Sequence, residues 1–220
     1  MPPFAPRFAA AIIDLDGTMV DTLGDFHAAL NAALADLGAE RIGRAFIEQT
    51  IGKGSEHLVR QTLSAVSAPE GCYDEALARY QHHYKRINGE HAAVYHGVLE
   101  GLARLQSCGL KLACLTNKPL AFARALLEQK GLAPFFSLCF GGDSFDRKKP
   151  DPLPVLRTCE ALGEAPSRVL VIGDSENDAR AARAAGCQVM LVPYGYNHGR
   201  PVTEVDCDGV VDRLDTVPIA

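Results

Sequence analysis

Short runs of apolar residues without polar alternation recur along this chain and predict buried β-strands. The clearest runs cover residues 8–14, 110–115, 169–172 and 187–192, and a weaker one covers residues 136–140. A strand that is buried on both faces of a parallel sheet shows such a continuous apolar run, because neither face meets water. We therefore expect a mainly parallel sheet.

Helical patterns separate these runs in the C-terminal half of the chain. They cover residues 119–130, 152–162 and 177–185, and Gly131 and Gly163 follow the first two. Proline suits the first turn of a helix and glycine suits the residue after its last turn. The alternation of strand and helix after about residue 98 predicts a doubly wound α/β sheet.

The segment from residue 19 to residue 96 contains only helical patterns. They cover residues 26–37, 54–66 and 73–88. So many helices without a strand exceed an ordinary crossover between two strands. We therefore expect a helical subdomain at residues 20–96, inserted into a core formed by residues 1–19 and 97–220. The alternative is that these helices cover one face of the sheet.

Composition and charge exclude several classes of protein. The net charge of -5 argues against a nucleic-acid binder, because neutralising phosphates needs a basic surface. No apolar run approaches the ~20 residues that span a bilayer, and residues 1–7 do not resemble a signal peptide. The seven cysteines are scattered and form no Cys-x-x-Cys pair, which indicates reduced thiols in a cytoplasmic protein. The oligomeric state is not indicated.

Two acidic residues, Asp14 and Asp16, stand where the first strand ends, and Gly17 follows them. Ligands of open α/β sheets bind at the carboxyl ends of the strands. Residues two apart in an extended segment share a face, and a turn at Gly17 can bring both acids toward one point. Buried carboxylates need a compensating cation, and Mg²⁺ prefers oxygen ligands of this kind. The alternative is a strand-ending loop with solvated acids.

Three further polar clusters follow later strands. Thr116, Asn117 and Lys118 end the second apolar strand, residues 148–152 place a lysine where prolines restrict the backbone, and residues 173–178 form another acidic group. Each cluster alone could be a helix cap or a solvated turn. Together with the first cluster they would meet in one crevice, which capping alone does not explain.

In their order and intervals, these four clusters resemble the motifs of the haloacid dehalogenase-like superfamily, and the resemblance covers essentially the whole chain. It implies a Mg²⁺-dependent phosphatase that acts on a small phosphorylated metabolite. The helical insertion resembles the mobile cap of the C1 type in that superfamily. Catalysis would therefore take place between the core and a cap that closes over the substrate.

The resemblance assigns roles to individual residues. Asp14 would attack phosphorus and become an aspartyl-phosphate, while Asp16 would serve as general acid and then as general base. Mg²⁺ would be bound by Asp14, the backbone carbonyl of Asp16, Asp174 and, through water, Asp178. The positively charged and polar groups around the transferred phosphoryl would be Thr116, Asn117 and Lys149.

Three further segments, at residues 51–56, 82–89 and 194–197, resemble bacterial phosphoglycolate phosphatases. Phosphoglycolate carries a carboxylate close to its ester oxygen. We expect Gly52, Lys53 and Gly54 to bind that group, because they precede a helix whose N-terminus favours an anion. One departure from the family is His96, which stands before Gly97 where proline is expected at the cap-to-core linker.

Other functions compete with this interpretation. On the same scaffold they are a sugar phosphatase, a phosphomutase and a phosphonoacetaldehyde hydrolase, for which Lys53 would be the reactive amine. A signalling receiver domain also combines acids, a threonine and a lysine, but its fold has no room for a helical insertion. A nucleotide-binding module is disfavoured, because the first strand is not followed by a Gly-x-Gly-x-x-Gly segment.

Overall fold

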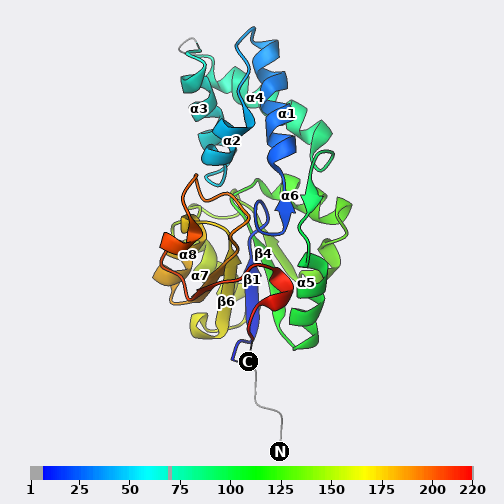
Figure 1. The fold of residues 1–220 in the computed structure, drawn as a ribbon, viewed down its shortest axis with the longest axis vertical. Coiled ribbons are helices and arrows are strands. Elements are labelled where there is room, and N and C mark those ends of the chain that lie inside the picture. The colour runs from blue at the N-terminus through cyan, green and yellow to red at the C-terminus, as the bar shows by residue number, and fades with distance from the viewer. Residues whose placement is uncertain (1–6, 69–70, 220) are drawn as a thin grey trace, which may run out of the picture.

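The computed structural model describes residues 7–68 and 71–219, and these fold into a sheet-based part with a bundle of helices at one end (Figure 1). The main sheet has the strand order β5-β4-β1-β6-β7-β8, and all neighbouring strands are parallel. Its strands are β1 (Ala10–Ile13), β4 (Lys111–Leu115), β5 (Leu138–Phe140), β6 (Val169–Gly173), β7 (Gln188–Leu191) and β8 (Gly209–Val210). The predicted α/β fold with a parallel sheet is confirmed.

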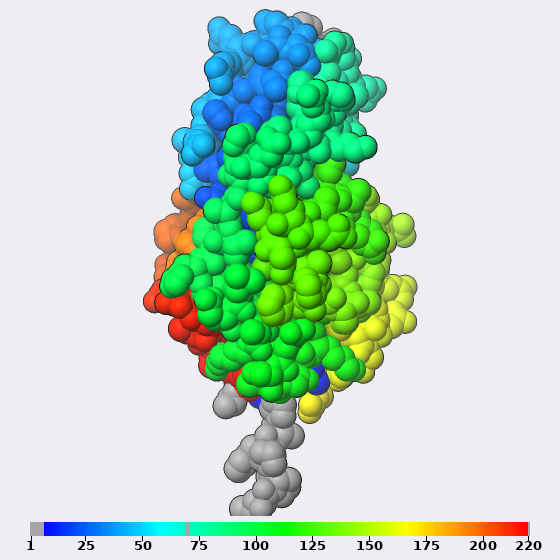
Figure 2. Space-filling view, turned by 90° about the vertical axis from the view of Figure 1, so that its right-hand side faces the viewer, coloured from blue at the N-terminus to red at the C-terminus, as the bar shows by residue number. Residues whose placement is uncertain are grey.

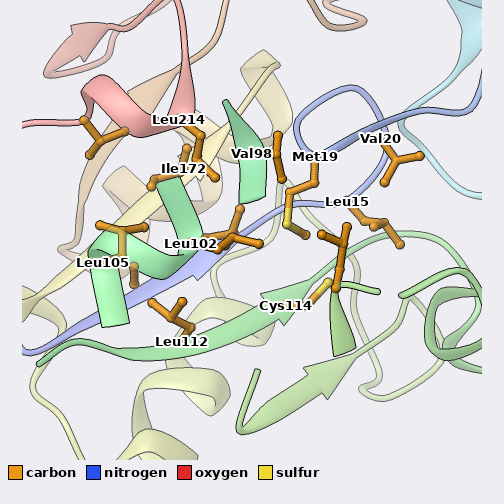
Figure 3. Packing of buried hydrophobic residues seen from close by; sticks show 14 of the residues in the cluster. Leu15, Met19, Val20, Val98, Leu102, Leu105, Leu112, Cys114, Ile172 and Leu214 are labelled. Carbon is orange, nitrogen blue, oxygen red and sulfur yellow. The ribbon is translucent and has the colours of Figure 1, made fainter. Parts of the chain in front are cut away.

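Two pairs of helices cover the two faces of this sheet. Alternate residues of β1 point to opposite faces, so Ala11 and Ile13 belong to one apolar cluster and Ala10 and Ile12 to the other. Helices α5 (Val98–Ser107) and α6 (Leu120–Gln129) pack on the first face, and α7 (Leu153–Leu162) and α8 (Glu176–Ala185) on the second. Figure 3 shows α5 placing Leu102 and Leu105 against this sheet.

Four helices form the bundle at the end of the sheet. They are α1 (Leu23–Asp36), α2 (Arg44–Thr50), α3 (Ser55–Ala65) and α4 (Tyr73–Ile87). The bundle has its own apolar cluster, in which Phe26, Tyr80 and Tyr84 are fully or almost fully buried. In the space-filling view it stands on the larger sheet-based part (Figure 2). The boundaries of the helical subdomain at residues 20 and 96 stay a prediction.

The expectation that residues 19–96 form only helices is wrong at both ends of this segment. Strand β2 (Val20–Asp21) pairs antiparallel with β3 (Ala93–Val94), so the two connections between bundle and core run side by side. Two-residue strands are too short to produce an alternating pattern. Helices α2 and α5 and strand β8 were also not predicted. No helix in the described residues is both long and apolar enough to cross a membrane.

Candidate active site

A cavity lies between the carboxyl edge of the sheet and the helical bundle. The bundle contributes apolar and aromatic residues such as Phe26, Leu58 and Tyr84, and the core contributes polar ones. The space between these walls is about 590 Å³ when its opening to solvent is included. The polar residues that the core contributes are Asp14, Asp16, Thr116, Asn117, Lys118, Lys149, Asp174, Ser175, Asn177 and Asp178.

A tight turn after β1 brings Asp14 and Asp16 to this cavity together. Gly17 adopts φ +84°, a left-handed conformation that favours glycine, and its N–H donates to the carbonyl of Val20 at 2.9 Å. A side chain at position 17 would also have no room, because a Cβ atom there would lie 2.1 Å from Oδ2 of Asp174. The turn therefore depends on glycine for both its backbone conformation and its contact with the acidic cluster.

Lys149 is a buried cation of the site. Its Nζ donates to Oδ1 of Asp178 at 2.6 Å and to the carbonyl of Leu115 at 2.8 Å, and it lies 2.9 Å from Oδ1 of Asp14. Burial alone would lower the pKa of Lys149, but the charges of Asp14 and Asp178 outweigh burial and raise that pKa above its usual range. Lys149 is therefore charged and held against the proposed nucleophile.

Three acids in the cavity form a cluster that can hold a metal ion. Asp14, Asp174 and Asp178 each offer a carboxylate oxygen, and these oxygens lie within 4.8 Å of one another. Oδ1 of Asp14 is buried and accepts no well-directed hydrogen bond among the described residues, although Lys149 is near. An all-oxygen donor set with an unsatisfied buried oxygen fits a hard divalent cation.

The raised pKa values of these acids also fit a bound cation. Burial, followed by the charges of Asp178 and Asp14, raises the pKa of Asp174 well above its usual range. Burial, together with Asp178 and Asp16, raises the pKa of Asp14 to about 7 although Lys149 opposes this change. The protein alone thus leaves these carboxylates under-compensated, and a bound cation would relieve their repulsion.

Asp16 has a separate environment from the acidic cluster. Its Oδ1 accepts hydrogen bonds from Oγ1 of Thr22 at 2.7 Å and from Nζ of Lys118 at 2.6 Å. The Lys118 side chain is only 2% exposed, and its Nζ also lies 4.6 Å from the ring centroid of Phe26. Lys118 belongs to one of the four motifs, but nothing in the sequence pattern distinguishes it as a site residue.

Comparisons with known proteins match this geometry. The family model described as haloacid dehalogenase-like hydrolase matches residues 11–192. The chain belongs to this family. It is 44% identical to a phosphoglycolate phosphatase of Thiobacillus denitrificans over 97% of this chain and 96% of the relative. Identity is also 44% to a phosphoglycolate phosphatase of Nitrosospira multiformis, over 93% of this chain and 92% of the relative.

A solved structure gives the same result. The crystal structure of a predicted phosphoglycolate phosphatase from Haemophilus somnus superposes on this haloacid dehalogenase-like hydrolase with a TM-score of 0.92. The two sequences are 30% identical, and the match covers 95% of this chain and 96% of the other. The predicted superfamily, the resemblance to phosphoglycolate phosphatases and the prediction of a phosphatase are confirmed.

In this hydrolase Thr116 and Asn117 line the cavity, but Asn117 already has partners for its side chain. Its Nδ2 donates to the carbonyls of Gly52 and Lys149 at 2.8 Å each, and its Oδ1 accepts from the N–H of Lys149 at 3.0 Å. Asn117 therefore positions Lys149 and ties it to the bundle. Oγ1 of Thr116 accepts from the N–H of Lys118 at 3.2 Å, so its hydroxyl proton is available to a ligand.

The loop at residues 52–54 reaches the cavity only in part. Gly52 and Gly54 line it, next to Ser55 at the start of α3. Lys53 is exposed and is not among the lining residues. Its predicted contact with the substrate stays a prediction, as do the roles of the other selected residues.

Tyr196 also lines the cavity, and the sequence pattern does not reveal its role. Its N–H donates to Oδ2 of Asp174 at 2.6 Å, and its hydroxyl accepts from the N–H groups of Thr22 and Leu23 at 2.9 and 3.1 Å. The same hydroxyl donates to Asp21. Tyr196 thus links the acidic cluster to the first connection between core and bundle.

Replacing Tyr196 with phenylalanine is expected to lower the free energy of unfolding by about 1–3 kcal/mol, because the buried N–H of Thr22 loses its acceptor. For a protein of this size that corresponds to a fall in Tm of roughly 2–4 °C per kcal/mol, measured by thermal unfolding. Tyr73→Phe in α4 is the matched control and is expected to change stability by less than about 0.5 kcal/mol. Equal Tm values for Tyr196→Phe and wild type would contradict this role of the hydroxyl.

Proposed function

We propose that this chain is a Mg²⁺-dependent phosphatase that hydrolyses 2-phosphoglycolate to glycolate and phosphate. The observation that carries the proposal is the convergence of Asp14, Asp16 and Lys149 with the acidic cluster in one cavity. The names of the relatives from Thiobacillus denitrificans and Nitrosospira multiformis support the substrate.

The first half of the proposed reaction transfers the phosphoryl group to the enzyme. A carboxylate oxygen of Asp14 attacks phosphorus, the bond between phosphorus and the ester oxygen breaks, and Asp16 gives a proton to the departing glycolate oxygen. Lys149 lies 2.9 Å from Oδ1 of Asp14, so its charge acts on the oxygens of the transferred group. The hydroxyl of Thr116 serves as a further donor to those oxygens.

The second half releases phosphate. Asp16, now deprotonated, takes a proton from a water molecule, and the oxygen of that water attacks phosphorus. The bond to the Asp14 oxygen breaks, which restores the carboxylate and frees inorganic phosphate. The helical subdomain at residues 20–96, proposed as the cap, limits the access of other water molecules during both halves.

The residues of the acidic cluster fit Mg²⁺. The proposed ligands are the carboxylates of Asp14 and Asp174, the backbone carbonyl of Asp16 and, through water, the carboxylate of Asp178. When bound, the ion supplies positive charge that compensates these acids and the phosphate oxygens. In the described structure the Asp16 carboxylate lies outside the cluster and is bound to Thr22 and Lys118, which agrees with a ligand role for its carbonyl rather than its side chain.

The test is a panel of small phosphate monoesters assayed for phosphate release with Mg²⁺ and with a chelator. We expect 2-phosphoglycolate to have the highest kcat/KM, above ethyl phosphate, p-nitrophenyl phosphate and hexose phosphates. Chelation is expected to remove activity and added Mg²⁺ to restore it. A hexose phosphate with a higher kcat/KM than 2-phosphoglycolate would contradict the substrate, and activity in the chelator would contradict the metal requirement.

A further inference from the structure

The side of the cavity next to Asp16 receives the part of the substrate that leaves. Asp16 protonates the ester oxygen in the proposed reaction, so the rest of the alcohol lies beyond that oxygen and close to the Asp16 carboxylate. Lys118 holds this carboxylate at 2.6 Å and is almost completely buried. Burying a positive charge costs free energy unless nearby anions compensate it. Asp16 is one such anion, and a second anionic partner would add to the compensation.

The ammonium group of Lys118 has N–H donors that the described residues do not use. An ammonium group has three N–H bonds, and among the described residues its hydrogen-bond acceptor is Oδ1 of Asp16. Its other contacts are with aromatic rings, since Nζ lies 4.6 Å from the ring centroid of Phe26 and 4.9 Å from that of Tyr84. These rings hold the ammonium in place without using its donors fully.

The hydroxyl of Tyr84 is a second unused donor in the same wall. Tyr84 is fully buried and lines the cavity, and its hydroxyl has no hydrogen-bond partner among the described residues. Burial, and after it the charge of Asp16, raises the pKa of Tyr84 well above its usual range, so the hydroxyl keeps its proton. A buried hydroxyl is rarely left unpaired, and an unpaired one points to a ligand that completes it.

The remaining walls limit the size of this ligand. Phe122 from the core packs on Tyr84 with ring centroids 5.1 Å apart, and Tyr80 packs on Tyr84 at 5.5 Å. The cavity is also lined by Gly54 and Ser55 at the start of α3, where the helix dipole favours an anion. An aromatic wall with cationic and polar donors fits a short anionic group.

We propose that Lys118 and Tyr84 bind the carboxylate of the leaving group, so that the enzyme selects phosphate monoesters whose alcohol carries a carboxylate next to the ester-bearing carbon. This subsite rests on the proposed function, because it places the glycolate part of the substrate beside Asp16. Lys118 then compensates both Asp16 and the substrate carboxylate, which would otherwise repel each other. The charge that recognises the substrate comes from the core and not from Lys53.

The test compares 2-phosphoglycolate with ethyl phosphate, which has a methyl group in place of the carboxylate. Both substrates have alkyl leaving groups, so a change that acts only through Asp16 affects them equally. In Lys118→Met, the ratio of kcat/KM for 2-phosphoglycolate to that for ethyl phosphate is expected to fall on the order of 10- to 100-fold, the range of a lost charge-assisted hydrogen bond. In Tyr84→Phe, which keeps the ring, the ratio is expected to fall about 5-fold.

Two lysine variants complete the design. Lys85→Met changes an exposed lysine on α4 next to Tyr84 and is the matched control, expected to leave both substrates unaffected. Lys53→Ala tests the cap loop, and a fall of the ratio in this variant but not in Lys118→Met would overturn the proposed subsite. If Lys118→Met does not fold, Tyr84→Phe decides, and an unchanged ratio overturns the proposal.

The outcomes separate the subsite from the function on which it rests. Wild-type enzyme without any preference for 2-phosphoglycolate over ethyl phosphate would overturn both proposals. A wild-type preference that survives in Lys118→Met and Tyr84→Phe would leave the function standing and overturn the subsite. Equal losses on the two substrates in Lys118→Met would show that Lys118 acts only by positioning Asp16, which also overturns the subsite.

Discussion

Replacement of Asp14 with asparagine is expected to lower kcat by on the order of 10⁴-fold or more, as for other lost nucleophiles. An amide has nearly the same shape as a carboxylate, but it has no charge and is a poor nucleophile. It also contributes a weaker oxygen to the acidic cluster, in which Asp14 lies with Asp174 and Asp178. The measurement is phosphate release from 2-phosphoglycolate with saturating Mg²⁺.

Folding is not expected to account for this loss. The change removes one of three clustered acids, and Lys149 keeps Asp178 and the Leu115 carbonyl as partners. Circular dichroism and a Tm no lower than that of the wild type would establish this. Asp36→Asn, at a half-exposed acid on α1, is the control for loss of one carboxylate outside the site.

A direct observation of the intermediate completes this test. Acid quenching of the wild-type enzyme during turnover, followed by mass spectrometry, is expected to detect one added phosphoryl group on the peptide that contains Asp14. The Asp14→Asn variant should show none. Turnover by Asp14→Asn near the wild-type rate, or a phosphoryl group on another residue, would contradict the covalent mechanism.

The sheet and the location of the site could be predicted from the sequence because both depend on local patterns. The strands at β1, β4, β6 and β7 are buried on both faces, so each is a continuous apolar run. Parallel strands end at the same edge, and the polar clusters that follow these runs therefore had to meet there. The cavity contains members of all four clusters, as this reasoning required.

The details that could not be predicted depend on contacts between distant residues. Lys118 was only one member of a polar triplet, and its partner Asp16 lies 102 residues away in the chain. The role of Asn117 beside the phosphoryl group stays a prediction, and the partners of its amide, Gly52 and Lys149, are not revealed by any spacing within its own motif. The sequence places such residues in a loop but does not tell which way each side chain points.

The cap loop illustrates the same limit. Gly52, Lys53 and Gly54 were selected because flexible residues and a charge precede a helix. The two glycines do line the cavity, but the charged residue between them is exposed. Backbone position followed from the local pattern, whereas the direction of the Lys53 side chain depended on how the bundle sits on the core.

Asp174→Asn is expected to remove the response of this protein to Mg²⁺ while making the metal-free protein more stable. Asp174 is 2% exposed, and burial together with Asp178 and Asp14 raises its pKa well above the usual range. A carboxyl group with a raised pKa binds its proton more tightly in the folded state than in the unfolded state. The free energy of unfolding therefore falls as the pH rises above the unfolded pKa of about 4.

Asp14 adds a loss of stability of the same sign. Its pKa rises from 3.8 to about 7, so its own part of the loss accumulates between these values and is complete above about pH 7. A cation that binds only the folded state reverses the loss, and it binds best when the acids are deprotonated. Mg²⁺ is thus expected to raise the Tm of the wild type more at pH 8 than at pH 5.

Asparagine at position 174 is expected to change both the stability of the metal-free protein and its response to Mg²⁺. One charge of the cluster is lost, so the Tm in a chelator at pH 8 is expected to exceed that of the wild type. Its Oδ1 can still accept from the N–H of Tyr196, and the hydroxyl of Thr18 can turn to accept from its Nδ2. A lost metal ligand should weaken Mg²⁺ binding by on the order of 100-fold or more and lower activity accordingly.

The measurement is thermal unfolding of wild type and Asp174→Asn at pH 5 and pH 8, each with a chelator and with Mg²⁺, beside the Mg²⁺ dependence of phosphate release. Glu160→Gln, at an exposed acid on α7, is the control and should respond to Mg²⁺ as the wild type does. A variant whose Tm and activity respond to Mg²⁺ as in the wild type would remove Asp174 from the metal site. The ion would then have to be held by the remaining acids of the cluster, Asp14 and Asp178.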